Sequence, residues 1–246
     1  MSQRQCAKTQ GASLKVAWQG IPWKHVHRHV FRLQKRIYRA TQRGDVRTVH
    51  KLQKLLVKSW YARLLAVRRI TQDNRGKHTA GIDGVKSLTP PQRWRLANEI
   101  RLNGTANALR RIWMPKRGSA TDKRPLGIPV MADRAGQALA KLALEPEWEA
   151  KFEPNSYGFR PGRSCHDAIE AIHASINQQD KYVLDADIEK CFDRICHRAL
   201  VSKLHTFPAL SRMITAWLKA GVMDGEELFP TETGAPQGGV RARRSA

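Results

Sequence analysis

Asp187 is the side chain of this sequence that is best placed to bind a metal ion. It ends a run, starting at Tyr182, in which apolar residues alternate with Asp185 and Asp187. Successive strand side chains point to opposite faces, so a strand would turn both carboxylates away from the apolar face. A carboxylate held where a strand ends is a rigid oxygen ligand for a hard cation such as Mg²⁺. We therefore expect a strand over 182–188, then a turn and a helix over 189–200.

The charge of the chain points to a polyanionic partner. The sequence has 246 residues, with 44 Lys or Arg against 21 Asp or Glu and a formal net charge of +23. The excess is uneven, because residues 1–80 hold 19 Lys or Arg and only 2 Asp or Glu. Such a field attracts phosphate backbones through counterion release, so we expect nucleic acid. A membrane surface is the weaker alternative, since there is no long apolar segment.

Two helical patterns between His25 and Ile70, separated by residues 41–45, carry much of this charge. In each, apolar residues recur every three or four positions with cations beside them. Like charges at this spacing repel, so a sequence that repeats them usually has an anion to neutralise them. The alternative is a solvated helical face, but such a face normally interleaves Glu with Lys. The expected contacts with an RNA or DNA backbone are Arg28, Arg32, Arg47, Lys51, Lys54 and Lys58.

The other elements predict an α+β fold. Helices are expected over 89–100, 133–152 and 164–176, and further strands over 111–114, 126–130 and 227–231. Thr89 followed by Pro90 is typical of a helix start, and the polar, glycine-rich stretch 71–84 is typical of a loop. Four cysteines without a Cys-x-x-Cys pair, and polar first residues, favour a reduced intracellular protein without a secretory signal. Cys191 and Cys196 are expected in a helical region.

Four motifs lie in order along the second half of the chain. They are residues 113–129, with Trp-Met-Pro-Lys-Arg-Gly-Ser and Lys-Arg-Pro-Leu-Gly-Ile-Pro; 155–164, Asn-Ser-Tyr-Gly-Phe-Arg-Pro-Gly-Arg-Ser; the Asp187 segment, 182–195; and 234–240, Gly-Ala-Pro-Gln-Gly-Gly-Val. Together with upstream segments such as Gly-Ile-Asp-Gly at 81–84, they resemble the group II intron reverse transcriptases, or intron-encoded maturases. The resemblance covers about residues 13–240.

This resemblance implies a right-hand polymerase architecture with fingers and an incomplete palm, preceded by a basic helical region. The implied organisation is a disordered leader over 1–12, the basic helical region over 13–84, and fingers with a partial palm over 85–246. The implied activity is RNA-directed DNA polymerisation with Mg²⁺. The implied partners are intron RNA, a DNA primer or target and deoxynucleoside triphosphates, in the cytoplasm of a bacterium or the interior of an organelle, without a membrane.

The resemblance also implies roles at the reaction centre. Asp187 is similar to the first metal-binding aspartate of the palm, and the carbonyl of Ile188 would be a further ligand. Lys116 and Arg124 are similar to the fingers residues that grip the triphosphate, and a point charge and a planar fork suit phosphate. Phe192 stands where the family places a bulky side chain against the sugar 2′ position, although simple core packing is an equal alternative.

Three further residues are implied to contact the template or the nascent base pair. Arg160 and Arg163 lie within Phe-Arg-Pro-Gly-Arg and resemble template or nucleotide contacts. Gln237 lies in Pro-Gln-Gly, where the following glycines allow the backbone to approach nucleic acid closely.

The sequence departs from the family in one respect that concerns activity. The second and third catalytic aspartates of the family belong to a Tyr-x-Asp-Asp hairpin downstream of Pro-Gln-Gly, and the residues up to Ala246 contain no such motif. Two-metal phosphoryl transfer needs these carboxylates. We expect a truncated chain that is inactive alone, with a possible trans-acting C-terminal half. The alternatives are a non-catalytic RNA-binding protein that assists splicing or, less well supported, a helix-turn-helix DNA-binding regulator.

Overall fold

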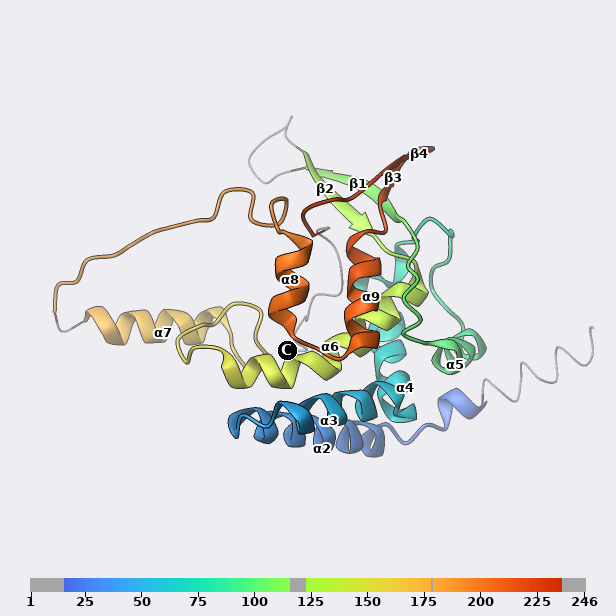
Figure 1. Ribbon diagram of the computed structural model, residues 1–246, viewed down its shortest axis with the longest axis horizontal. Helices are drawn as coiled ribbons and strands as arrows, with labels where there is room; N and C mark the ends of the chain where they lie inside the picture. Colours follow the sequence, from blue (N-terminus) through green and yellow to red (C-terminus); the bar gives the residue numbers. More distant parts are fainter. Residues whose placement is uncertain (1–15, 116–122, 178, 236–246) are drawn as a thin grey trace, which may run out of the picture.

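The computed structural model describes residues 16–115, 123–177 and 179–235 and is a mixed α/β structure with a small sheet (Figure 1). Its helices are α2 (Trp23–Gln42), α3 (Val46–Lys58), α4 (Trp60–Arg68), α5 (Pro90–Glu99), α6 (Met131–Lys151), α7 (Cys165–Ile176), α8 (His197–Leu204) and α9 (Pro208–Leu218). Its strands are β1 (Leu109–Pro115), β2 (Lys123–Ile128), β3 (Val222–Asp224) and β4 (Glu227–Phe229). No helix in the described part of the chain is long and apolar enough to cross a membrane.

Helices α2, α3, α4 and α6 pack together and hold most of the core (Figure 1). The apolar stripe predicted for the first helix is buried, and its members are Val26, Val30, Leu33 and Ile37. The second predicted pattern is not one helix, because Ser59 is extended and separates α3 from α4. Asp45 begins α3 by accepting a hydrogen bond from the Thr48 backbone N–H at 3.0 Å. This capping bond satisfies one of the N–H groups that a helix start leaves unpaired.

Helices α2, α3, α4 and α6 form a helical layer. Hydrogen bonds to two buried side chains of α6 hold the segments that connect this layer to the sheet. Arg134 donates to the carbonyl oxygens of Pro129, Gly76 and Thr79 at 2.8, 2.9 and 2.6 Å. Burial lowers the pKa of Arg134. A Cβ on Gly81 would lie 2.7 Å from the Val130 Cα, so only glycine allows this close approach. The stretch 71–84 was predicted as a loop. It contains two short helical turns, η1 (Arg69–Asp73) and η2 (Arg75–His78), and the contacts with Arg134 and Val130 hold it against the start of α6.

The second of these side chains is Asp133, which joins α6 to the chain before β1 and to α9. Its carboxylate accepts hydrogen bonds from the Asn107 backbone and side chain at 3.0 and 3.1 Å and from Trp217 Nε1 at 3.1 Å. These three bonds satisfy a carboxylate that is 6% exposed.

The sheet has the strand order β2-β1-β3-β4. Strands β1 and β2 are antiparallel, with Trp113 opposite Pro125 and Met114 opposite Arg124. Strand β3 pairs with β1 in parallel, with Leu109 opposite Val222, and β3 and β4 form an antiparallel hairpin. The strands predicted over 111–114, 126–130 and 227–231 are confirmed with shifted ends. Strand β3 and helix α9 were not predicted.

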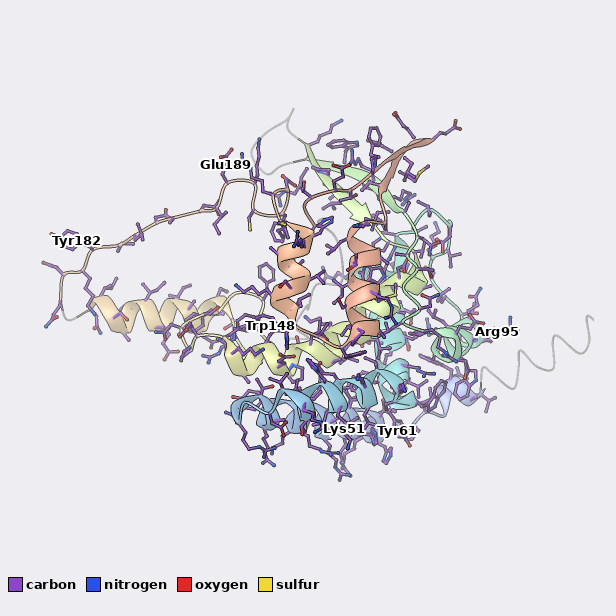
Figure 2. The ribbon with its side chains drawn as sticks, in the orientation of Figure 1. Lys51, Tyr61, Arg95, Trp148, Tyr182 and Glu189 are labelled. Atoms are coloured by element: carbon purple, nitrogen blue, oxygen red, sulfur yellow. The ribbon has the colours of Figure 1, made fainter. Side chains whose placement is uncertain are left out.

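The strand predicted over 182–188 is wrong. These residues form an exposed segment without strand pairing, in which Tyr182 and Leu184 are 107% and 91% exposed (Figures 1 and 2). A strand is stabilised by hydrogen bonds to a neighbouring strand and by burial of one face, and the described residues provide neither here. The alternating pattern predicted which residues could share a face, but not that a partner strand is present.

Two neighbouring predictions also need correction. The helix expected within 189–200 begins only at His197, after turns that include Cys191 and with Cys196 as its N-cap, so neither cysteine lies within a helix. Helix α7 starts as predicted after Ser164, which with Asp167 forms a capping box. Its apolar face, however, stays exposed, and α7 has no buried residue.

Candidate nucleotide and nucleic-acid site

A cleft of about 440 Å³ lies between the sheet and two loops that are far apart in sequence. The sheet contributes residues of all four strands, one loop is the turn before α8, and the other loop is the chain that follows β4. The lining residues are Arg111, Pro125, Leu126, Gly127, Phe192, Asp193, Val222, Phe229, Pro230, Thr231, Glu232, Thr233, Gly234 and Ala235. The cleft therefore joins three of the four motifs that the sequence analysis selected.

Backbone hydrogen bonds hold these two loops together. The Gly234 N–H donates to the Ile195 carbonyl at 2.8 Å, and the Ala235 N–H donates to the Phe192 carbonyl at 2.7 Å. Gly234 has φ +81°, and a Cβ there would lie 2.9 Å from the carbonyl oxygens of Phe192 and Asp193. Glycine is thus required both by the backbone conformation and by the close approach of the two loops.

His197 supports the same loop pairing and was not among the residues predicted from the sequence. Its Nε2 lies 2.6 Å from the Gly234 carbonyl oxygen, which can only accept, so Nε2 donates. The ring is 7% exposed, and its Nδ1 is buried without a partner among the described residues. No motif marked this histidine, and the helix that it begins was expected to start earlier, within 189–200.

The sheet side of the cleft is cationic and aromatic. The Arg111 guanidinium lies 5.5 Å from the ring centroids of both Trp113 and Phe229 and 3.6 Å from the Asp224 carboxylate. Arg124 is exposed on β2, immediately before the cleft-lining Pro125. Lys116 and Gln237 lie outside the described residues.

Phe192 and Asp187, predicted to act together, differ in position. Phe192 lines the cleft and is 47% exposed, so it is available to a ligand. Asp187 belongs to the exposed segment rather than to the cleft lining, and its Oδ1 accepts a hydrogen bond from the Ile188 N–H at 2.9 Å. The described residues contain no group of three His, Cys, Asp or Glu side chains that could hold a metal ion. Asp187 can therefore serve as one carboxylate ligand, and two-metal chemistry would need further carboxylates beside it.

Arg160 and Arg163, predicted as template contacts, also differ. The Arg160 guanidinium donates to the Glu149 carboxylate at 2.7 and 3.1 Å and to two backbone carbonyls, and its side chain is 5% exposed. These bonds use its donors inside the protein and argue against a direct template contact. The Arg163 guanidinium lies 5.5 Å from the Tyr157 ring and remains half-buried.

The basic faces of α2 and α3 are fully accessible. Arg28, Arg32, Arg47, Lys51, Lys54 and Lys58 are all exposed. Lys51 lies at the lower edge of the helical layer, as does Tyr61 of α4 (Figure 2). The Tyr61 ring lies 5.2 and 4.6 Å from the rings of His25 and His29 on α2. We call the six cations the α2–α3 basic face.

Two protein-family models match the sequence of this chain. The model of the N-terminal domain of reverse transcriptase matches residues 18–100, and the model of reverse transcriptase (RNA-dependent DNA polymerase) matches residues 114–242. Protein YkfC of Escherichia coli K12 is 36% identical over 192 residues, which cover 72% of this chain and 49% of YkfC.

Two further relatives are named as intron-encoded or maturase-like proteins. The group II intron-encoded protein LtrA of Lactococcus lactis is 36% identical over 135 residues, 54% of this chain and 22% of LtrA. Maturase-like protein 1 of Euglena gracilis is 29% identical over 201 residues, 76% of this chain and 42% of that protein. The chain thus spans half or less of the length of each of these relatives. It belongs to the reverse transcriptase family, and its relatives include group II intron-encoded and maturase-like proteins.

Proposed function

We propose that this chain carries the fingers and the first part of the palm of a group II intron-type reverse transcriptase and maturase, which binds intron RNA and copies it into DNA. The observation that supports this most directly is the cleft, in which the β1–β2 sheet, Phe192 and Gly234 converge although they are far apart in sequence. A site of action in a bacterial cytoplasm or an organellar interior, with a DNA primer and deoxynucleoside triphosphates as partners, is part of the same proposal.

In this proposal the cleft receives the incoming nucleotide. Arg124 and, outside the described residues, Lys116 bind the triphosphate, because guanidinium and ammonium groups suit phosphate oxygens. Phe192 packs against the sugar, and Gln237 lies near the nascent base pair. Arg163 contacts the template, whereas Arg160 keeps the preceding loop in place through Glu149.

The metal chemistry requires more carboxylates than the described residues bring together. Asp187 and the Ile188 carbonyl stay proposed ligands of Mg²⁺, and no Tyr-x-Asp-Asp sequence occurs among the 246 residues. We therefore propose that polymerisation uses carboxylates from a segment outside these residues, in the same polypeptide or in a second one. When bound, the ions would activate the primer hydroxyl and stabilise the leaving group.

A second candidate function is supported by the contrast between the two predicted sites. The α2–α3 basic face is exposed and complete, whereas Asp187 has no carboxylate cluster around it among the described residues. A non-catalytic protein that binds structured intron RNA and assists its splicing would use the first site and not the second.

Primer extension on an RNA template separates the two candidates. We expect no incorporation by the 246-residue polypeptide alone, and incorporation after addition of a polypeptide that carries the family's Tyr-x-Asp-Asp hairpin. Asp187→Ala should abolish that activity. RNA binding that persists while no mixture polymerises would favour the splicing function. Incorporation by the 246-residue polypeptide alone would overturn the need for added carboxylates.

RNA binding is tested separately by charge reversal. Replacing Lys51, Lys54 and Lys58 with Glu should weaken binding to intron RNA and lower the salt slope of the affinity by about one for each phosphate that is no longer neutralised. An unchanged affinity would show that the α2–α3 basic face does not bind RNA.

A further inference from the structure

Arginines of α4 and of the α5 region lie where these two helices meet, shortly after the α2–α3 basic face along the chain. Trp60 of α4 and Trp94 of α5 pack edge to face with ring centroids 5.3 Å apart. Arg63 lies one helical turn after Trp60, Arg93 directly precedes Trp94, and Arg101 follows the end of α5. We call Arg63, Arg93 and Arg101 the α4–α5 arginine surface.

Two of these arginines have side chains without a partner. Among the described residues, the guanidinium groups of Arg63 and Arg93 form no hydrogen bond or ion pair, and the Nε of each is buried without an acceptor. Burial lowers the pKa of both, and the charge of Arg101 lowers that of Arg63 further, so these two cations are close enough to repel. The nearest acid along the chain, Glu99, is exposed and forms no ion pair in the described structure.

The third arginine is already oriented. Arg101 Nη1 donates to the carbonyl oxygens of Asn98 and Ile100 at 2.5 and 2.8 Å, at the C-terminal end of α5. These bonds hold the guanidinium in place and leave its other donors available. The side chains of Arg134 and Arg160, in contrast, are buried and saturated with acceptors of the protein itself. Arg134 and Arg160 thus have acceptors within the protein, whereas Arg63 and Arg93 have none among the described residues.

An anion would complete this arrangement. Half-buried guanidinium groups with unused donors are short of acceptors, and phosphate oxygens match the planar fork of arginine. The Trp60 and Trp94 rings pack against each other and against the core, so they fix the two helices that carry these arginines. The site is separate from the α2–α3 basic face, since Arg95 marks α5 at one side of the molecule while Lys51 lies at the lower edge (Figure 2).

We propose that Arg63, Arg93 and Arg101 form a second phosphate-binding surface, which holds the backbone of the same RNA that the α2–α3 basic face binds. The inference rests on the proposed RNA-binding function and adds a second point of attachment. An RNA long enough to reach both surfaces binds more tightly than one that covers a single surface.

The test compares Arg63→Gln/Arg101→Gln with Arg95→Gln in filter binding to a long structured RNA at several salt concentrations. Arg95 is a matched control, because it is exposed on α5 and leaves the helix on a different side from Arg93. We expect the double variant to bind about tenfold more weakly at physiological salt, with a salt slope about two units smaller. Arg95→Gln should change affinity by less than about twofold. Equal effects of the two variants would overturn the inference.

Further measurements locate the binding surface and separate the possible outcomes. Ultraviolet crosslinking should attach the RNA to peptides that contain Trp60 and Trp94, and Arg63→Lys should give an intermediate affinity because it keeps the charge but not the fork. If RNA does not crosslink to these peptides but polyglutamate does bind this surface, the surface binds an acidic protein and the inference fails. If wild-type protein binds no RNA, the proposed function itself fails. If only the α2–α3 variants weaken binding, the proposed function stands without this second surface.

Discussion

Periodic apolar side chains are buried in the helical layer formed by α2, α3, α4 and α6, whereas they are exposed in the segment from Phe152 to Phe192. In the layer, the apolar stripes of α2, α3 and α6 face one another, and Leu56 is fully buried. In the segment, Ile169 and Leu184 belong to equally regular patterns yet are 62% and 91% exposed. Periodicity identifies the side chains that gain by burial, whereas burial itself depends on a second surface of matching shape.

The largest expected effect comes from the same substitution in both regions. Leu56→Ala removes a buried side chain and leaves a cavity, so we expect the free energy of unfolding to fall by about 2–5 kcal/mol. Leu184→Ala should change it by less than about 0.5 kcal/mol, because its side chain is already in solvent. Urea denaturation of both variants measures the difference, and similar decreases would mean that the segment has a partner surface.

A smaller effect should follow from Gly234→Ala, which places a Cβ against the turn that carries Phe192. The left-handed backbone and the 2.9 Å approach both oppose the substitution, and we expect a cost of about 1–3 kcal/mol. Gly162→Ala is the control, because φ is +73° there with open space around the added atom. Hydrogen exchange of the Ala235 amide reports the loop pairing, and the prediction fails if both variants leave it equally protected.

His197 provides a gentler way to loosen the same pairing of loops. His197→Leu removes the hydrogen bond to the Gly234 carbonyl and should cost about 1 kcal/mol in local opening. His197→Gln keeps an amide donor at similar reach and should restore most of the protection of the 234–235 amides. If Leu and Gln behave alike, the ring contributes by packing and not by its hydrogen bond.

The smallest effect concerns pH in the helical layer. Burial, followed by the charges of Arg68 and Arg69, lowers the pKa of His27. The unfolded chain therefore binds the proton first as pH falls through about 6.5, and the folded protein becomes less stable below that value. Urea midpoints at pH 7.5 and pH 5.5 should differ less for His27→Gln than for wild type. An unchanged difference would remove His27 as the cause.

How far the sequence predicted the structure depended on where each element finds its partners. The starts of α5 after Thr89 and of α7 after Ser164 depend on local capping residues and on proline, and both were predicted. The four motifs were selected correctly as a set, and three of them meet at the cleft. The strand over 182–188 was wrong because pairing is not a local property.

The candidate site shows the same limit in its individual residues. Arg160 has the residue type and motif of a template contact, but its guanidinium group already donates hydrogen bonds to Glu149 and to two backbone carbonyls. His197 and Asp133 carry no motif and became evident only through long-range hydrogen bonds. A sequence records which groups can form such bonds, and the fold decides which of them do.

The parallel pairing of β1 with β3 sets an order in which the molecule can assemble. Leu109 and Val222 lie more than 100 residues apart, so their pairing closes a long loop that contains α6 through α9. Closure of such a loop is entropically costly, and pairings of this range form late in folding. The last helix of the helical layer, α6, ends at Lys151. During synthesis all four helices of the layer therefore leave the ribosome well before β3 does. The nascent protein thus has the α2–α3 basic face before it has the cleft beside the sheet.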